Sequence, residues 1–558
     1  MKYVYFLSAA LLLSTSCADV LDKKNLSTIP EDVVWNDVNY ATAYVNKLHR
    51  DNLPGWDGNI SCLSDEANGN SGTNILYGQL TSSSIDNWPY TNIRNINIFL
   101  ENIEKGTIEE DKKEELKGQV YFMRAWKYFE MVRLYGGVPI IDKPQSLDDD
   151  LYVTRNKTSE CIDFIISDLD KAAEALPWSW TNKDVGRITK AAALAMKARI
   201  LLYYASPQFN PDNDKARWEK AYEANKFAKE ELAKNGYGLY SDYAGFWFNE
   251  MNEEVVFAYR YQEPGITNNW DAGTRPLDES MNVRGFNQPS LEMVNSYPMA
   301  DGRPITDPNS GYNPDAYWEN RDPRFKASIA YNGCLWELNG KTGRKQWTFV
   351  GAEIAPGKTG FYCRKAVDVN NTVYLAQHSS TDWVEIRYAE VLLNFAECAA
   401  ELGKIDEAYD VLKQIRKRAG IIPGDGEMYG LDLNMNTDQM IDAIMLERKI
   451  EFAFEGKRYW DLRRRRLFAE ELNGTKRHGV YPILKMDKDK FLEIESTIDL
   501  NKDYRKYFRD SIVELDKVFT IDFKDNYYFY GIPLKHLETN SKLEQTQGWD
   551  EGTFNPYE

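Results

Sequence analysis

The chain has 558 residues, and its content of 43% hydrophobic and 28% charged residues excludes an intrinsically disordered protein. Its formal net charge of −18 disfavours contact with nucleic-acid phosphates, which needs clustered Lys and Arg side chains, so we expect no nucleic-acid partner. The length suits either three or four domains of about 150 residues or one large scaffold.

The N-terminus has the anatomy of an export signal. Lys2 supplies a positive charge, Tyr3–Leu13 is apolar, and the small residues Ser14–Ser16 lead into Cys17. The apolar run is too short to cross a bilayer core, which takes about 20 residues. The stretch resembles a bacterial lipoprotein signal, although serine replaces the usual leucine three places before the cysteine. We expect residues 1–16 to be a signal peptide and Cys17 to carry the lipid; a plain cleaved signal or a buried apolar N-terminus is the alternative.

Helical periodicity first appears over Leu116–Tyr135. One face of this segment collects large apolar side chains, namely Phe122, Trp126, Phe129 and Val132. The sequence GGVP follows directly and ends the pattern, because glycine and proline interrupt helices. We therefore predict one helix with a strongly apolar face.

Two later pairs of segments resemble tetratricopeptide helical hairpins. Thr189–Ala205 and Trp218–Ala233 form the first pair, and their many alanines allow neighbouring helices to approach closely. Arg387–Gly403 has two adjacent apolar stripes, and a second helix follows it to about Ala419. A long insertion within the first pair excludes a strict 34-residue repeat.

A last helix is predicted over residues 437–466. It contains Glu447, Glu451 and Glu455 at intervals of four residues and ends in the run Arg463–Arg466. Nearby basic side chains can pair with these carboxylates, so an internal ion-pair network or a solvated face explains the charges. A site for phosphate or a lipid headgroup is the alternative.

The rest of the chain is rich in turns. Residues 51–92 and 262–381 hold many Gly, Asn and Ser residues together with aromatic rings, while residues 255–261 alternate as a strand does. Long irregular segments in a compact protein are usually functional or disordered. Because large rings can stack on sugars and peptides, we expect ordered loops shaped for binding.

Enzyme motifs find no support. The glycines of Gly351–Thr359 have the wrong spacing for a P-loop, and no helix pattern follows them. The four histidines are isolated and no CxxC pair occurs, so we expect no metal, no cofactor and no enzyme activity. With 86 acidic residues, the carboxylate pair of a glycosidase stays an open alternative.

The cysteines after Cys17 are widely scattered. Cys161 and Cys398 lie in helical patterns, where a free thiol is usually a small buried apolar group. Exported proteins can contain disulfides, so a disulfide between Cys334 and Cys363 stays an open alternative.

Stretches distributed over nearly the whole chain resemble the SusD/RagB family of surface nutrient-binding lipoproteins. In chain order they are CADVLD, NWPYTNIRNINIFLENI, GQVYFMRAWKYFEMVRLYGGVPII, GRITKAAALAMKARILLYYASP, RDPRF, EIRYAEVLLNFAECAAELGKIDEAYDVLKQIRKRAG, ERKIEFAFEGKRYWDLRRR and YYFYGIPLKHLETNSKLEQTQGW. The resemblance implies a mainly α fold, with tetratricopeptide-like hairpins on one side, an irregular loop-rich face on the other, and a few short strands. It also implies a single domain over residues 17–558, with an N-terminal part to residue 250 and a C-terminal part from residue 251.

The same resemblance implies a lipid-anchored protein on the outer face of a Gram-negative outer membrane. Members of the family cap a SusC-like TonB-dependent transporter, capture oligosaccharides and release them into its barrel. In some branches of the family the ligand is a peptide. A lipid-anchored glycoside hydrolase is a further, weaker alternative.

In the family, ligand contacts come from a loop near the N-terminus and from the middle of the chain. The matching first loop offers Asp65, Glu66, Asn68, Asn70, Asn74 and Tyr77. The matching middle segment offers Asn269, Trp270, Arg275, Arg284 and Phe286. Trp270 is the foremost candidate, because it has no evident helix or strand in which to pack. Four other tryptophans are expected to be packing residues: Trp126, Trp383, Trp460 and Trp549.

Overall fold

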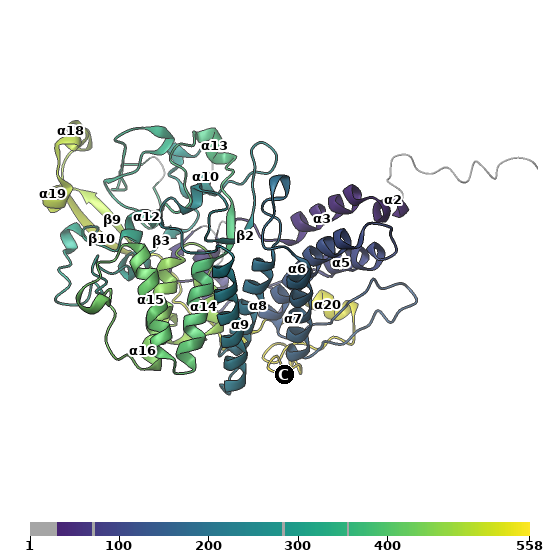
Figure 1. Ribbon diagram of the computed structural model, residues 1–558. Helices are drawn as coiled ribbons and strands as arrows, with labels where there is room; N and C mark the ends of the chain where they lie inside the picture. The colour runs from purple at the N-terminus through teal and green to yellow at the C-terminus, as the bar shows by residue number, and fades with distance from the viewer. Residues whose placement is uncertain (1–30, 58, 70–72, 282–284, 354–355) are drawn as a thin grey trace, which may run out of the picture.

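The computed structural model describes residues 31–57, 59–69, 73–281, 285–353 and 356–558, so the predicted signal peptide and Cys17 lie outside the described residues. Long helices lie side by side in one half of the molecule, and an irregular, loop-rich half covers one end of them (Figure 1). The prediction of a mainly α fold with a loop-rich face is confirmed.

The long helices form a continuous array (Figure 1). In it α6 packs on α7, α7 on α8, α8 on α9, α9 on α14, and α14 on α15 and α16. The bounds are α2 Glu31–Asn36, α3 Val38–Asn52, α5 Tyr90–Ile103, α6 Glu110–Tyr135, α7 Thr158–Ala175, α8 Lys190–Ala205, α9 Lys215–Lys234, α14 Tyr388–Glu401, α15 Ile405–Ala419 and α16 Thr437–Glu451.

Shorter elements build the other half and the edges. The short helices are α4 Thr73–Leu76, α10 Trp270–Thr274, α11 Leu291–Ser296, α12 Pro323–Ser328, α13 Val373–Gln377, α17 Arg458–Arg464, α18 Lys488–Ile494, α19 Leu500–Tyr507 and α20 Leu534–Thr539. The strands of the described residues form antiparallel pairs: β1 Ala67–Asn68 with β3 Gln288–Pro289, β2 Val255–Tyr259 with β8 Trp383–Arg387, β4 Ile329–Ala330 with β7 Tyr362–Cys363, β5 Cys334–Leu335 with β6 Lys345–Gln346, and β9 His478–Leu484 with β10 Phe508–Glu514.

Local signals in the sequence account for the helix ends. The hydroxyl of Thr189 accepts a hydrogen bond from the amide of Ala192 and so caps α8, and Gly136 ends α6 with a φ of 76°. The single helix predicted over residues 437–466 is wrong. Phe454 and Gly456 adopt φ values of 63° and 70°, which turn the chain between α16 and α17.

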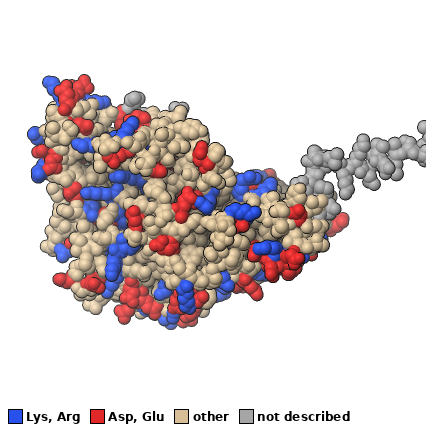
Figure 2. Space-filling view, turned by 45° about the horizontal axis from the view of Figure 1, so that its top comes forward, with Lys and Arg blue, Asp and Glu red and all other residues tan. Residues whose placement is uncertain are grey.

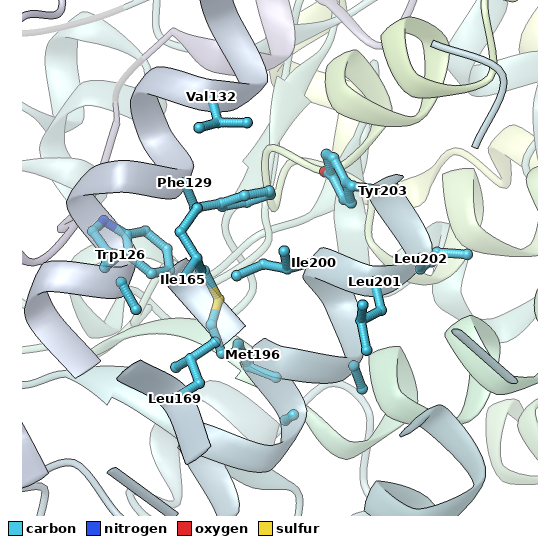
Figure 3. Packing of buried hydrophobic residues seen from close by; sticks show 14 of the residues in the cluster. Trp126, Phe129, Val132, Ile165, Leu169, Met196, Ile200, Leu201, Leu202 and Tyr203 are labelled. Carbon is cyan, nitrogen blue, oxygen red and sulfur yellow. The ribbon is translucent and has the colours of Figure 1, made fainter. Parts of the chain in front are cut away.

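The helical half has a conventional hydrophobic core. Trp126 and Phe129 of α6 face Ile165 of α7 and Met196 and Ile200 of α8 (Figure 3). The alanines of α8 are buried, so the helices can pack closely as predicted.

The loop-rich half has a second core cluster, built from rings that are far apart in the sequence. It includes Trp270, Trp318, Trp336, Phe349 and Tyr362. Trp126, Trp383 and Trp549 are buried and Trp460 is half-buried, so the prediction that they are packing residues is consistent with their positions.

The described cysteines are all free and buried. The disulfide left open between Cys334 and Cys363 is therefore absent. Cys161 and Cys398 lie in the helical core, as predicted.

A buried ion-pair network joins the two halves. Arg387, at the end of β8, contacts Glu254 and Glu451 at 2.6 Å each and Glu455 at 2.8 Å. Arg324 of α12 contacts Glu451 at 2.8 Å. Burial alone would raise the pKa of Glu451, but the surrounding guanidinium groups hold it well below its usual range. The network therefore depends on all its members being charged.

The arginine run at the end of α17 is also internal. The guanidinium of Arg464 contacts Glu397 at 2.6 Å and Asp461 at 2.8 Å, and that of Arg463 donates to the hydroxyl of Tyr530 at 2.5 Å. Both arginine side chains are completely buried. The interpretation as an internal network is thus confirmed for these two residues, and they cannot form a phosphate or headgroup site on the surface.

Acidic and basic side chains are interspersed over the face seen in Figure 2, without one large basic patch. Among the described helices, none is long and apolar enough to span a membrane.

Candidate functional site

The first predicted loop is tied into the protein interior. The carboxylate of Asp65 contacts the ammonium of Lys449 at 2.7 Å and the guanidinium of Arg458 at 3.0 Å. These cations outweigh the effect of burial and lower the pKa of Asp65. Asn68 is buried in β1. Asp65 is held by two cations of the protein and Asn68 is largely buried, so neither residue is presented freely on the surface; as ligand contacts both stay predictions.

Glu66 is completely buried as well and is not presented to a ligand. One of its carboxyl oxygens accepts a hydrogen bond from the amide of Phe454 at 3.2 Å, and the other has no partner among the described residues. Burial raises the pKa of Glu66 to about 8. At neutral pH this side chain is thus a protonated acid inside the protein.

The remaining residues of the first loop differ in exposure. Asn74 is exposed on α4, whereas Tyr77 is half-buried and its hydroxyl donates to the carboxylate of Asp516. Asn70 lies outside the described residues. Asn74 and Tyr77 stay predictions as ligand contacts.

Trp270 is an anchor of the second core cluster. It stacks on Trp56 with ring centroids 4.4 Å apart, and its indole nitrogen donates to the carbonyl of Lys365 at 3.1 Å. Only 2% of its surface is exposed. Trp270 was the foremost candidate because the sequence shows no element in which it could pack, and that reason is wrong. Its packing partner Trp56 comes from a distant segment, which periodicity cannot reveal.

Arg275 is likewise a buried internal support in this structure. Its guanidinium contacts Asp271 at 2.6 Å and donates to the carbonyls of Asp368 and Asn371 at 2.5 and 3.0 Å. Together with Trp270, it holds residues 365–371 through hydrogen bonds to their backbone carbonyls.

The other residues of the middle segment lie nearer the surface. Asn269 is exposed, and the partly exposed Phe286 lies against Gly273, where a Cβ atom would come within 2.0 Å of its ring. Arg284 lies outside the described residues. Asn269 and Phe286 stay predictions as ligand contacts.

The segment held by Trp270 and Arg275 forms one wall of a surface cavity of about 520 Å³, which we call the loop-face cavity. Its walls also come from the turn before β2, from α12 and from the β5 strand end. The lining residues are Ala244, Phe248, Pro323, Lys326, Ala327, Trp336, Arg364, Val367, Asp368, Val369 and Asn370.

The loop-face cavity combines an exposed ring with unpaired polar groups. Phe248 is 47% exposed, although its neighbours Phe246 and Trp247 are buried. The guanidinium of Arg364 has no hydrogen-bond or ion-pair partner among the described residues and lies 6.0 Å from the ring centre of Trp336. The indole nitrogen of Trp336 also lacks an acceptor there. An apolar ring beside free donors is an arrangement that suits a sugar.

Sequence reasoning missed this cavity. Its walls come from segments up to about 130 residues apart, and the triplet Phe246–Phe248 contains two core rings and only one exposed ring. Among the described residues, no group of His, Cys, Asp and Glu side chains could hold a metal ion.

Comparison with known families accounts for this arrangement of helical array and loop-rich face. A family model described as the SusD family matches residues 253–549, which is more than half of the chain. The chain belongs to the SusD family. A second model, described as starch-binding associating with outer membrane, matches residues 58–202 of this SusD-family protein. Phe248 lies between the two matched ranges.

Individual relatives agree with the assignment. SusD-like protein P2 of Formosa agariphila is 26% identical over 428 residues, which cover 75% of each chain. A SusD-like protein from Bacteroides fragilis has a similar structure, with a TM-score of 0.76, 29% identity, and coverage of 94% of this chain and 100% of the other. A SusD-like carbohydrate-binding protein, also from Bacteroides fragilis, shares the fold at 21% identity, with a TM-score of 0.72 and coverage of 91% and 99%.

Proposed function

We propose that this SusD-family protein binds an oligosaccharide at the loop-face cavity and delivers it unchanged to a SusC-like TonB-dependent transporter. The observation that carries the proposal is the exposed ring of Phe248 beside the unpaired guanidinium of Arg364. The ring can support the apolar face of a sugar. The guanidinium of Arg364 and the side-chain amide of the exposed Asn370 can then form hydrogen bonds with the hydroxyl groups of the sugar.

The comparisons favour a glycan over the alternative ligand, a peptide. The family model that matches the N-terminal part is described as starch-binding, and the relative in Bacteroides fragilis is described as carbohydrate-binding. A peptide-binding member remains the second candidate, because free donors and an exposed ring also suit a peptide.

The acidic residues at the loop-face cavity also favour a binding role over glycoside hydrolysis. Hydrolysis ordinarily needs two carboxyl groups that flank the scissile bond. Among the described residues that line the cavity, the only acid is Asp368, and its carboxylate accepts a hydrogen bond from the amide of Asn370 at 2.9 Å.

Titration of the protein with a glycan library that includes short peptides tests the ligand class. For the best ligand, Phe248→Ala should weaken binding about tenfold, because it removes the stacking surface. The melting temperature should stay unchanged, since the ring is exposed.

Tyr374→Ala is the matched control, because Tyr374 is an exposed ring of α13 that does not line the cavity. An unchanged dissociation constant in Phe248→Ala would exclude the loop-face cavity as the binding site. Turnover of the glycan would exclude a purely binding role.

We further propose that Cys17 carries the lipid anchor and that the protein faces the cell exterior. Cys17→Ala should then move the protein from the outer-membrane fraction to the soluble fraction. Retention in the membrane would contradict the anchor. Copurification of the wild-type protein with a TonB-dependent transporter after mild detergent extraction tests the proposed partner.

A further inference from the structure

A second cavity, of about 330 Å³, lies between the helical array and the loop-rich half. We call it the inner cavity. Trp126, Glu130 and Arg133 line it from one face of α6, at spacings of four and three residues. Arg199 and Tyr203 line it from α8. The remaining walls come from β8, from the starts of α14 and α17, from α16, and from Pro54, Gly55, Asp57 and Ile60. It shares no lining residue with the loop-face cavity.

Most charges around the inner cavity are neutralised within the protein. Arg199 contacts Glu385 and Glu390 at 2.6 Å each. Lys457 approaches the same two carboxylates at 3.2 and 3.5 Å. Glu130 contacts Lys127 at 2.8 Å. These paired groups therefore do not favour a charged ligand.

Two lining charges have no ion pair among the described residues: the exposed carboxylate of Asp57 and the guanidinium of Arg133. This guanidinium lies 3.8 Å from the ring centre of Trp460 but has no hydrogen-bond or ion-pair partner among the described residues. Its Nε atom is completely buried, and burial lowers the pKa of the side chain. A partly desolvated cation without a directly bonded anion is unfavourable, and the carboxylates of Glu130 and Glu385 offset its charge only from a distance, so Arg133 can still accept one anionic group.

A second unsatisfied donor belongs to the same wall. Trp126 is 2% exposed, and its indole nitrogen has no acceptor among the described residues. The rings of Trp383, Trp460 and Tyr203 line the cavity as well. The inner cavity thus offers one unpaired cation, an excess of donors and several aromatic surfaces.

These properties define the ligand. A carboxylate brings one negative charge and two acceptor oxygens, which match a guanidinium in bidentate geometry. The carboxylates of Glu130 and Glu385 nearby disfavour a dianion such as phosphate. The volume lies at the lower end of the range for ligand pockets, about 300 to 1,000 Å³, which suits one sugar ring better than a chain.

We propose that the inner cavity binds a single uronic-acid residue, whose carboxylate pairs with Arg133 while its ring lies against the aromatic wall. This site is separate from the proposed oligosaccharide site, so either proposal can fail without the other. It gives the protein a means to recognise acidic glycans by a terminal residue.

Calorimetric titration with glucuronate, glucose and acetate tests the proposal. Glucuronate should bind about tenfold more tightly than either control, because glucose lacks the charge and acetate lacks the ring. Arg133→Met should remove this preference. The variant should also fold at least as stably as the wild type, since it takes away a cation without leaving a partner unpaired.

Arg466→Met is the matched control variant, because Arg466 also lies over a ring, 4.2 Å from the centre of Tyr528, but does not line the inner cavity. It should bind glucuronate as the wild type does. Equal affinity for glucuronate, glucose and acetate would overturn the proposal, and so would full glucuronate affinity in Arg133→Met. Retention of glucuronate binding by Phe248→Ala would separate the inner cavity from the loop-face cavity.

Discussion

The two halves of the molecule satisfy their backbone polar groups in different ways. In the array from α6 to α16, the amides and carbonyls pair within each helix. In the loop-rich half, buried arginines replace those local partners: Arg321 donates to the carbonyls of Val294, Tyr297 and Tyr317, and Arg477 to those of Cys62 and Ala67. Irregular backbone can therefore be ordered when charged side chains from distant segments take up its hydrogen bonds.

The comparison predicts the largest loss of stability at the ion-pair network between the halves. Glu451→Ala should lower the free energy of unfolding by about 5 kcal/mol, because it takes a shared anion from the buried guanidinium groups of Arg324 and Arg387 and leaves each of them only partly paired. Urea denaturation followed by circular dichroism measures the change. Glu101→Ala, which removes an exposed ion pair with Lys105, should cost under about 1 kcal/mol. If both variants lost the same free energy of unfolding, the buried network would contribute no more to stability than an exposed ion pair does.

Trp270→Ala should cost about 4 kcal/mol, since it opens a cavity in the core of the loop-rich half. Thermal unfolding measures this loss. If Trp270→Ala also weakens ligand binding, we expect the cause to be the loosened segment 365–371 and not the loss of a contact between Trp270 and the ligand. A variant of full stability with weakened binding would restore Trp270 as a ligand contact.

Glu66 makes the stability of the loop-rich half depend on pH. Its pKa is raised to about 8 in the folded protein from a usual 4.5, so the folded state holds more protons than the unfolded state between these values. The free energy of unfolding should therefore fall as the pH rises through this window. Glu66→Gln should remove that part of the slope and be more stable than the wild type by about 2 kcal/mol above pH 8.

Denaturant titrations of both proteins across this pH range provide the measurement. If the free energy of unfolding changed with pH in the same way in both proteins, the pKa of Glu66 would not be raised in the folded state.

The smallest effect is expected in the helical half, where stabilising contacts are many and local. Thr189→Ala removes the cap of α8 and should cost about 1 kcal/mol. Urea denaturation detects a change of this size. A cost comparable to that of Glu451→Ala would contradict the contrast between the halves.

The same contrast explains what could be predicted from the sequence. The helices α6, α8, α9, α14 and α15 were predictable because their apolar positions repeat every three to four residues. The break between α16 and α17 was missed: Gly456 is a turn signal in the sequence, but the positive φ of Phe454 beside it has no glycine to indicate it.

The candidate site was less predictable than the helices. Trp270 and Arg275 were predicted from the sequence as ligand contacts, whereas the structure shows both of them buried. Their partners Trp56, Lys365 and Asp368 are brought near only by the folded chain. Spacing along the sequence therefore identified the segment that supports the loop-face cavity but not the residues that line it.

The bonds that hold Asp65 have a consequence for folding. Its partners Lys449 and Arg458 lie 384 and 393 residues later in the chain. The first loop can therefore reach its final conformation only after most of the C-terminal half has been made and has docked. Contacts of such sequence separation form slowly, so ordering of residues 60–69 is expected late in folding. A truncation that removes Lys449 and Arg458 would accordingly loosen a loop close to the N-terminus.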